Sequence, residues 1–278
     1  MIELKPYGFK QWKFPGGEVG VKLDPAWKTA GMNNPVTPKI IIRGKVNHDE
    51  IFVVLNLLDA LDNARGLNNS ILLTDLDFSY MPYGRQDRVC HEGESFALEV
   101  FVRTLATFEM LINRIVVDDP HSDVFYRLCE KYMPNVSVKV VPQDVCMVGL
   151  VKRGDFDLVV GPDAGSRGKA TEAAIRLGTP VLLLSKVRKD GQVVYENLTP
   201  DMINGRVLIV DDIGDGMATF VSAGEMIRRT QPRVTKLHVH VTHGIFSRGL
   251  DHLVGTFDSV STYNLMNPNV ANHPLLAK

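Results

Sequence analysis

Short apolar runs alternate with longer amphipathic segments along most of this 278-residue chain, and this rhythm limits the folds open to it. Apolar runs of about four to eight residues are typical of buried strands, and the segments between them have helical periodicity. Parallel strands need a crossover connection that a helix supplies, so the alternation predicts mostly parallel sheets with helices on both faces. We expect an α/β fold with two doubly wound lobes, residues 1–140 and 141–278.

The predicted elements have the following bounds. Strands are expected at 40–43, 71–75, 114–117, 137–141, 158–160, 180–184, 207–210 and 236–242. Helices are expected at 50–64, 94–108, 122–131, 166–177 and 220–229. The two ends of the chain, Met1–Pro25 and Asn267–Lys278, have the least regular pattern.

Composition and charge exclude several classes of partner. The formal net charge is -1 with 23% charged residues, so no strong field favours nucleic acid or an anionic membrane. The three cysteines form no CxxC pair, which is typical of a reducing compartment. No signal peptide or apolar run of membrane-spanning length is visible. These features predict a cytoplasmic protein.

Residues Val207 to Thr219 carry the strongest chemical signal. The apolar run Val207–Val210 ends in Asp211 and Asp212, at the strand edge where open α/β sheets bind ligands. A glycine-containing turn and a helix-like segment follow, so main-chain amides and the positive helix end favour an anion there. Carboxylates that grip hydroxyls beside an anion cradle suit a phosphorylated sugar. An acidic strand-to-helix turn with Asp215 as helix N-cap is an equally open alternative.

Two further turns follow predicted strands. Gly161–Lys169 resembles a nucleoside-triphosphate loop only superficially, because Asp163 replaces its first glycine and Ala170 its hydroxyl residue. The turn suits a second phosphate or metal-phosphate contact, or is an ordinary connection. In Asp118–Asp123, His121 could contact a metal or a nucleotide phosphate, or could simply be hydrogen-bonded within the turn.

Basic side chains gather in two other segments. Arg85 and Arg88 lie in the turn Met81–Arg88, where arginine forks could hold phosphate or stack on a base. Ser185–Gly191 is a basic cluster that could close over a polyphosphate as a mobile loop, or form a solvated hairpin.

Two histidines alternate along the last predicted strand. His238 and His240 should share one strand face, because side chains in a strand alternate. No third ligand stands at a recognisable spacing, so we reject a zinc site there.

The order of these segments is more specific than any one of them. The chain resembles the ribose-phosphate diphosphokinase (PRPP synthetase) family from about residue 14 to residue 247. The resemblance rests on Phe14–Glu18, Pro82–Asp87, Asp119–His121, Pro162–Gly165, Lys186–Arg188, Val210–Asp212 and Thr242–Ser247.

The resemblance implies two phosphoribosyltransferase-like lobes and transfer of the β,γ-diphosphate of Mg-ATP to the 1-hydroxyl of ribose 5-phosphate, with AMP released. It implies ATP contacts from Arg85, Gln86, Asp87 and His121, and from Phe14 and Glu18 of a neighbouring subunit. A homo-oligomer, dimer or hexamer, is therefore expected.

The remaining implied roles concern metal, catalysis and the sugar. His121 and Asp163 would lie at the Mg²⁺ site, and Lys186 and Arg188 would be catalytic cations. The ribose hydroxyls and 5′ end would be bound by Asp211, Asp212, Asp215, Gly216, Met217, Ala218 and Thr219.

The sugar-phosphate loop departs from the family pattern. Gly216 replaces a threonine and Ala218 replaces a glycine, so a hydroxyl donor to the 5′-phosphate is missing and space is left beside it. An acceptor with a bulkier 5′ substituent is therefore a second hypothesis: ADP-ribose, as in a similar phage branch of the family that serves NAD salvage. A type I phosphoribosyltransferase and an inactive, synthetase-like regulatory subunit are the competing classes.

Overall fold

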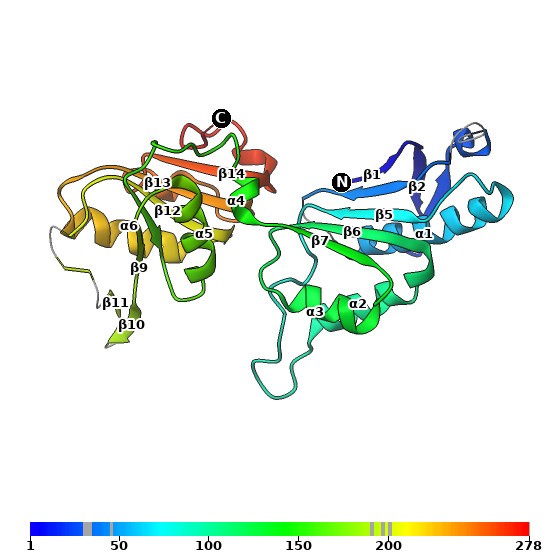
Figure 1. Ribbon diagram of the computed structural model, residues 1–278, viewed down its shortest axis with the longest axis horizontal. Coiled ribbons are helices and arrows are strands. Elements are labelled where there is room, and N and C mark those ends of the chain that lie inside the picture. Colours follow the sequence, from blue (N-terminus) through cyan, green and yellow to red (C-terminus); the bar gives the residue numbers. More distant parts are fainter. Residues whose placement is uncertain (30–34, 45–46, 190–191, 196–197, 200–201, 278) are drawn as a thin grey trace. The chain divides into compact units, whose positions relative to one another are not determined.

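The computed structural model describes residues 1–29, 35–44, 47–189, 192–195, 198–199 and 202–277. The chain divides into two compact units, Met1–Val141 and Pro142–Lys278, and each contains its own five-stranded sheet (Figure 1). Among the described residues, no helix is long and apolar enough to cross a membrane.

The sheet of the N-terminal unit has the order β1-β4-β5-β6-β7, and only β1 runs antiparallel to its neighbour. Its strands are β1 (Ile2–Lys5), β4 (Lys39–Ile42), β5 (Thr74–Phe78), β6 (Ile112–Asp118) and β7 (Ser137–Val141). The helical segments are α1 (His48–Leu67), α2 (Ala97–Ala106) and α3 (Val124–Tyr132), with short 3-10 turns at Pro25–Lys28 and Glu109–Leu111. Helices α2 and α3 lie side by side (Figure 1).

A hairpin of β2 (Phe9–Lys13) and β3 (Val19–Leu23) forms a separate two-stranded sheet that packs on α1. The side-chain amide of Asn56 in α1 donates to the main-chain oxygen of Val19 at 3.0 Å, which fastens the hairpin to the helix.

The sheet of the C-terminal unit is fully parallel, with the order β14-β13-β12-β8-β9. Its strands are β8 (Leu158–Gly161), β9 (Val181–Leu183), β12 (Gly205–Gly214), β13 (Val234–Gly244) and β14 (Ser259–Leu265). The helices are α4 (Gln143–Cys146), α5 (Arg167–Leu177) and α6 (Ala218–Thr230), with 3-10 turns at Asp251–Leu253 and Pro268–Val270.

Strand β12 is central and is buried on both faces. Val207 and Ile209 belong to the hydrophobic cluster that includes Phe220 and Ile227 of α6. Leu208 and Val210 belong to a second cluster that includes alanines of α5. This two-sided burial explains why the sequence shows an uninterrupted apolar run rather than alternation.

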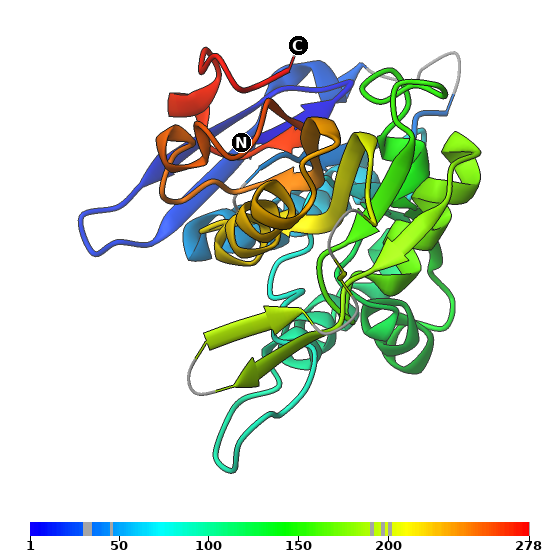
Figure 2. The same cartoon turned by 90° about the vertical axis from the view of Figure 1, so that its left-hand side faces the viewer.

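The basic segment forms a hairpin of β10 (Lys186–Lys189) and β11 (Gln192–Tyr195), which projects away from the five-stranded sheet of its unit (Figure 2). The backbones of Lys186 and Arg188 lie in β10, whereas their side chains are outside the described part of the structure. The backbone of this segment is thus a hairpin, and whether its basic side chains are solvated or reach a polyphosphate concerns atoms outside the described part of the structure.

The predicted α/β class with mostly parallel sheets is confirmed, and every predicted strand and helix overlaps an observed one. The expectation of least regularity at Met1–Pro25 was wrong, because β1, β2 and β3 lie there. Strand β14 was missed. Its sequence, SVSTYNL, is mostly polar and contains no apolar run that would mark a buried strand.

Candidate active site

The tandem carboxylates Asp211 and Asp212 lie within β12 rather than in a loop after it. The strand continues past its predicted end because β13 stays paired with it as far as Gly214 and Gly244. The main-chain N–H of Asp212 donates to Oδ1 of Asp211 at 2.9 Å, and Asp212 is buried with 5% of its surface exposed. The two carboxylates are thus held on a rigid element.

The electrostatics of this pair are unusual. Burial raises the pKa of Asp211 to about 8, and the negative charge of Asp212 contributes in the same direction. The pair therefore retains a proton near neutral pH when no ligand neutralises it.

The segment after β12 leads directly into a helix N-terminus. Helix α6 begins at Ala218, and its N-cap is Met217, which has the left-handed φ of 59° and makes no side-chain cap. The alternative role of Asp215 as N-cap is therefore wrong. The first amides of a helix have no intrahelical acceptor, so those of Ala218 and Thr219 are suited to an anion. The Met217 side chain is buried in the core, which leaves its main chain for any ligand.

An arginine that the sequence did not single out lies beside this segment. A Cβ built on Gly216 would lie 3.5 Å from Cδ of Arg248, an exposed residue after β13. The missing side chain at Gly216 therefore leaves room next to a cation. No sequence signal pointed to Arg248, because only the fold brings it next to the turn.

Asp163 organises the turn between β8 and α5. Its Oδ1 accepts hydrogen bonds from the amides of Gly165 at 3.0 Å and Ser166 at 3.2 Å. The hydroxyl of Ser166 donates back to the main-chain oxygen of Asp163 at 2.8 Å. One carboxylate oxygen thus shapes the turn, and Oδ2 is the atom available for a metal or phosphate-bound water.

The N-terminal unit brings two of the predicted segments together. The turn before Arg85 has Tyr83 at a left-handed φ of 59°, and the hydroxyl of Tyr83 lies 3.2 Å from Nδ1 of His48. A Cβ built on Gly84 would lie 3.9 Å from Cβ of His121, so the two turns are neighbours. Arg85 and His121 are both exposed.

Asp87 differs from the residues before it in the Arg85 turn. Its carboxylate is buried at 7% exposure, with Nε of Arg88 3.5 Å from Oδ1. Gln86 is exposed, and its main-chain oxygen accepts from Leu98 of α2. Asp87 is thus better placed to support the turn than to reach a ligand.

Phe14 and Glu18 lie in the turn of the β2–β3 hairpin. The amide of Phe14 donates to the main-chain oxygen of Glu18 at 2.8 Å, and both side chains are exposed. Trp12 contacts the Phe14 ring edge-on, with centroids 5.8 Å apart.

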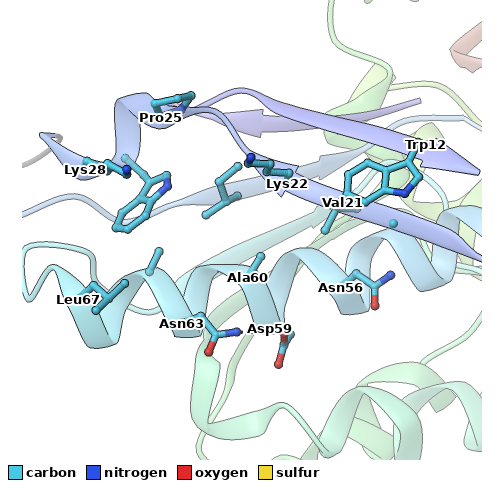
Figure 3. A pocket seen from close by; sticks show the side chains of 14 residues that line it. Trp12, Val21, Lys22, Pro25, Lys28, Asn56, Asp59, Ala60, Asn63 and Leu67 are labelled. Atoms are coloured by element: carbon cyan, nitrogen blue, oxygen red, sulfur yellow. Dashed lines mark hydrogen bonds between the residues drawn. The ribbon is translucent and has the colours of Figure 1, made fainter.

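A groove of about 650 Å³ lies between this hairpin and α1 (Figure 3). Trp12 and Lys22 approach it from the hairpin, and Asn56, Asp59 and Asn63 approach it from the helix. None of the predicted site residues lines it.

His238 and His240 share one strand face as predicted. The hydroxyl of Ser261 lies 2.8 Å from Nε2 of His238 and 2.9 Å from Nδ1 of His240. Burial lowers the pKa of His238 to about 4 and that of His240 to about 3, so both rings are neutral. Among the described residues no group of three or more His, Cys, Asp or Glu side chains could hold a metal ion.

Several known proteins are similar to this chain in sequence and in fold. Residues 150–254, which include the whole Asp211–Thr219 segment, match the model of the phosphoribosyl transferase domain. A ribose-phosphate pyrophosphokinase of Thermococcus kodakarensis is 28% identical over 85% of this chain and 78% of its own length. One of Thermoplasma acidophilum is 24% identical over 93% of this chain and 88% of its own length.

A solved structure of phosphoribosylpyrophosphate synthetase from Mycobacterium smegmatis has the same fold. It superposes with a TM-score of 0.75 at 21% identity, over 98% of this chain and 85% of the other. In sequence and in fold, the chain is therefore similar to ribose-phosphate pyrophosphokinases, also called PRPP synthetases.

Proposed function

We propose that this protein transfers the β,γ-diphosphate of Mg-ATP to the anomeric 1-hydroxyl of ribose 5-phosphate, giving PRPP and AMP. The observation that carries the proposal is the carboxylate pair at the end of β12, followed at once by the uncapped start of α6. Both lie inside the segment that matches the phosphoribosyl transferase domain.

The acceptor sugar would be held from two directions. Ionised Asp211 and Asp212 accept hydrogen bonds from neighbouring ribose hydroxyls, which replaces the mutual repulsion of the pair with two donors. Main-chain amides of Asp215–Thr219 bind the 5′-phosphate at the positive end of α6. Arg248 supplies a cation beside Gly216, where the hydroxyl typical of the family is missing.

ATP would be held by the exposed Arg85 and Gln86, on a turn that the buried Asp87 supports. Phe14 and Glu18 would complete the ATP contacts from a neighbouring subunit, and their exposure at a hairpin turn is compatible with this role. The active form would then be a homo-oligomer. The cytoplasmic location stays a prediction of the sequence.

The residues available suit Mg²⁺. Magnesium prefers oxygen ligands and usually combines one or two carboxylates with substrate phosphates and water. Oδ2 of Asp163 is such a donor, and the exposed His121 can contact the phosphates or a metal-bound water. The ion, when bound with ATP, supplies charge neutralisation on the transferred phosphates.

The chemical step needs positioning more than a strong base. The sugar 1-hydroxyl oxygen bonds to the β-phosphorus of ATP, the bond from that phosphorus to the bridging α-phosphate oxygen breaks, and AMP leaves. The hydroxyl proton passes to solvent. Lys186 and Arg188 would stabilise the charge that develops at the bridging oxygen. We expect Lys186→Ala to lower turnover at least ~10²-fold with little change in sugar binding, and near-normal turnover would remove this residue from the mechanism.

The direct test is mass spectrometry of the products from Mg-ATP and ribose 5-phosphate, with ADP-ribose in a parallel reaction. The proposal predicts equal amounts of AMP and a sugar that is heavier by one diphosphate with ribose 5-phosphate. ADP and a sugar that is heavier by one phosphate would contradict diphosphoryl transfer. Modification of ADP-ribose alone would keep the chemistry but refute the acceptor.

The other classes are less well supported. The relatives named as pyrophosphokinases match 85% and 93% of the chain, whereas the phosphoribosyl transferase model matches residues 150–254. A type I phosphoribosyltransferase would consume PRPP and leave ATP intact. An inactive regulatory subunit would bind ATP without releasing AMP.

A further inference from the structure

Gln143, the first residue of α4, has a buried side chain that joins the ends of two strands. Its Nε2 donates to the main-chain oxygen of Asp211 at 2.6 Å and to Oγ1 of Thr242 at 3.1 Å. The residue is 1% exposed, and its partners are 68 and 99 residues away in sequence. One amide therefore holds the carboxyl ends of β12 and β13 together.

The position of this amide follows from the sheet topology. Strand β8 pairs with β12 only as far as Val160 and Ile209, whereas β13 stays paired to Gly214. Beyond Ile209 the β8 side of β12 has no strand partner in the part of the chain that the structure describes. Asp211 lies two residues past this point. A side-chain donor restrains the strand where a neighbouring strand no longer does.

We propose that Gln143 is a positioning residue for the acceptor site, which fixes the main chain of Asp211 and thereby the carboxylate pair without touching the sugar. The inference rests on the proposed function, because it assigns the pair to acceptor binding. Sites of this kind need their groups held to fractions of an ångström, so a loosened strand end weakens binding.

The contacts require a donor at this position. Nε2 contacts two oxygens, and one of them, the main-chain oxygen of Asp211, can only accept a hydrogen bond. The Oε1 atom of Gln143 is buried and has no hydrogen-bond partner among the described residues. Gln143→Leu keeps the volume but removes both hydrogen bonds. Gln143→Glu can donate only while its carboxyl is protonated, so its effect must depend on pH.

A second buried glutamine provides a matched control. Gln231 is also 1% exposed, accepts from the amide of Ile203 at 2.7 Å and donates to the main-chain oxygen of Thr199 at 2.7 Å. It precedes β13, at the opposite end of the same strand from Thr242. Gln231→Leu therefore removes comparable buried hydrogen bonds from the same unit, away from Asp211.

The experiment measures KM for ribose 5-phosphate and for Mg-ATP in the full-length protein and its three variants. Gln143→Leu should raise the sugar KM at least about tenfold and leave the Mg-ATP KM within about twofold, whereas Gln231→Leu should change neither. The ratio of the Gln143→Glu sugar KM to the wild-type value should rise between about pH 6 and about pH 8.5, as its buried carboxyl ionises. Equal sugar KM values in the two leucine variants, or a Gln143→Glu ratio that is constant with pH, would overturn the inference.

A failure of the proposed function would leave this inference testable. If the wild type releases no AMP with ribose 5-phosphate, the proposed function fails, and hydrogen exchange still tests the positioning. The amides of Asp212 and Ile213 should then exchange faster in Gln143→Leu than in Gln231→Leu, and equal rates would refute it. If Gln143→Leu does not fold, the pH series of Gln143→Glu decides.

Discussion

The Asp211 carboxyl should make the stability of the C-terminal unit fall as pH rises through neutrality. Burial, and then the charge of Asp212, raise the pKa of Asp211 to about 8 in the folded protein. The unfolded chain, with an ordinary aspartate pKa near about 4, has already released this proton. The stabilisation of the folded state by this bound proton is therefore fully present below about pH 4 and is lost as the pH rises towards about 8.

The size of the effect follows from the width of this window. Each pH unit inside it changes the free energy of unfolding by about 1.4 kcal/mol, because the folded state binds one more proton than the unfolded state. Between about pH 5.5 and about pH 7.5, the wild type should lose about 3 kcal/mol through this group. Asp211→Asn has no titrating carboxyl there, so its stability relative to the wild type should rise by that amount over the interval.

The assay must report on the correct unit. Both tryptophans, Trp12 and Trp27, lie in the N-terminal unit, so their fluorescence does not follow the region of interest. Unfolding of the C-terminal unit is instead followed by hydrogen exchange of peptides from residues 205–214 in increasing urea. Asp157→Asn is the control, because Arg206 lowers the pKa of the exposed Asp157 to about 2, outside the window, and its pH profile should parallel the wild type. A difference between wild type and Asp211→Asn that is the same at both pH values would refute the reasoning.

Three further outcomes are expected. Burial lowers the pKa of His240 to about 3, so the neutral ring stabilises the fold above the unfolded-state pKa of about 6.5, and this stabilisation is lost as the pH falls. In the same exchange assay, His240→Gln should therefore flatten the dependence of stability on pH between about pH 6 and about pH 4. An unchanged slope would contradict this prediction. Gly224→Ala would place Cβ 2.6 Å from Cζ of Phe257, so we expect a loss of about 1–3 kcal/mol in urea denaturation with an unchanged sugar KM, whereas unaltered stability would show that the site relaxes. Arg248→Met should raise the KM for ribose 5-phosphate about tenfold or more and leave that for unphosphorylated ribose unchanged, and an equal effect on both sugars would remove Arg248 from phosphate binding.

The sequence predicted the parallel framework because buried parallel strands leave a local signal. Val207–Val210 is apolar on both faces, and that burial is what the structure shows. The end of β12 was placed too early, because hydrophobicity stops at Val210 while pairing with β13 continues to Gly214. Polar strands such as β14 and the β2–β3 hairpin have no apolar run and were missed.

Some candidate site residues could be predicted from the local sequence, and others could be found only from the fold. The acidic pair and its glycine-containing turn form one contiguous stretch, so local chemistry was sufficient to single them out. The roles proposed for Gln143 and Arg248 rest only on long-range contacts to Asp211 and Gly216, and nothing local distinguishes these two residues from ordinary polar residues. The geometry of the hairpin turn with Phe14 and Glu18 is likewise visible only in the fold.

Phosphorus NMR of Mg-ATP with ribose 5-phosphate, with wild type and with the double variant Asp211→Asn/Asp212→Asn, tests the central claim most directly. Wild type should convert ATP to AMP while two coupled phosphorus signals of a diphosphate ester appear on carbon 1 of the sugar, and the double variant should need far more sugar for the same rate. An unchanged sugar dependence in the double variant, or phosphate release without an ester on carbon 1, would contradict it.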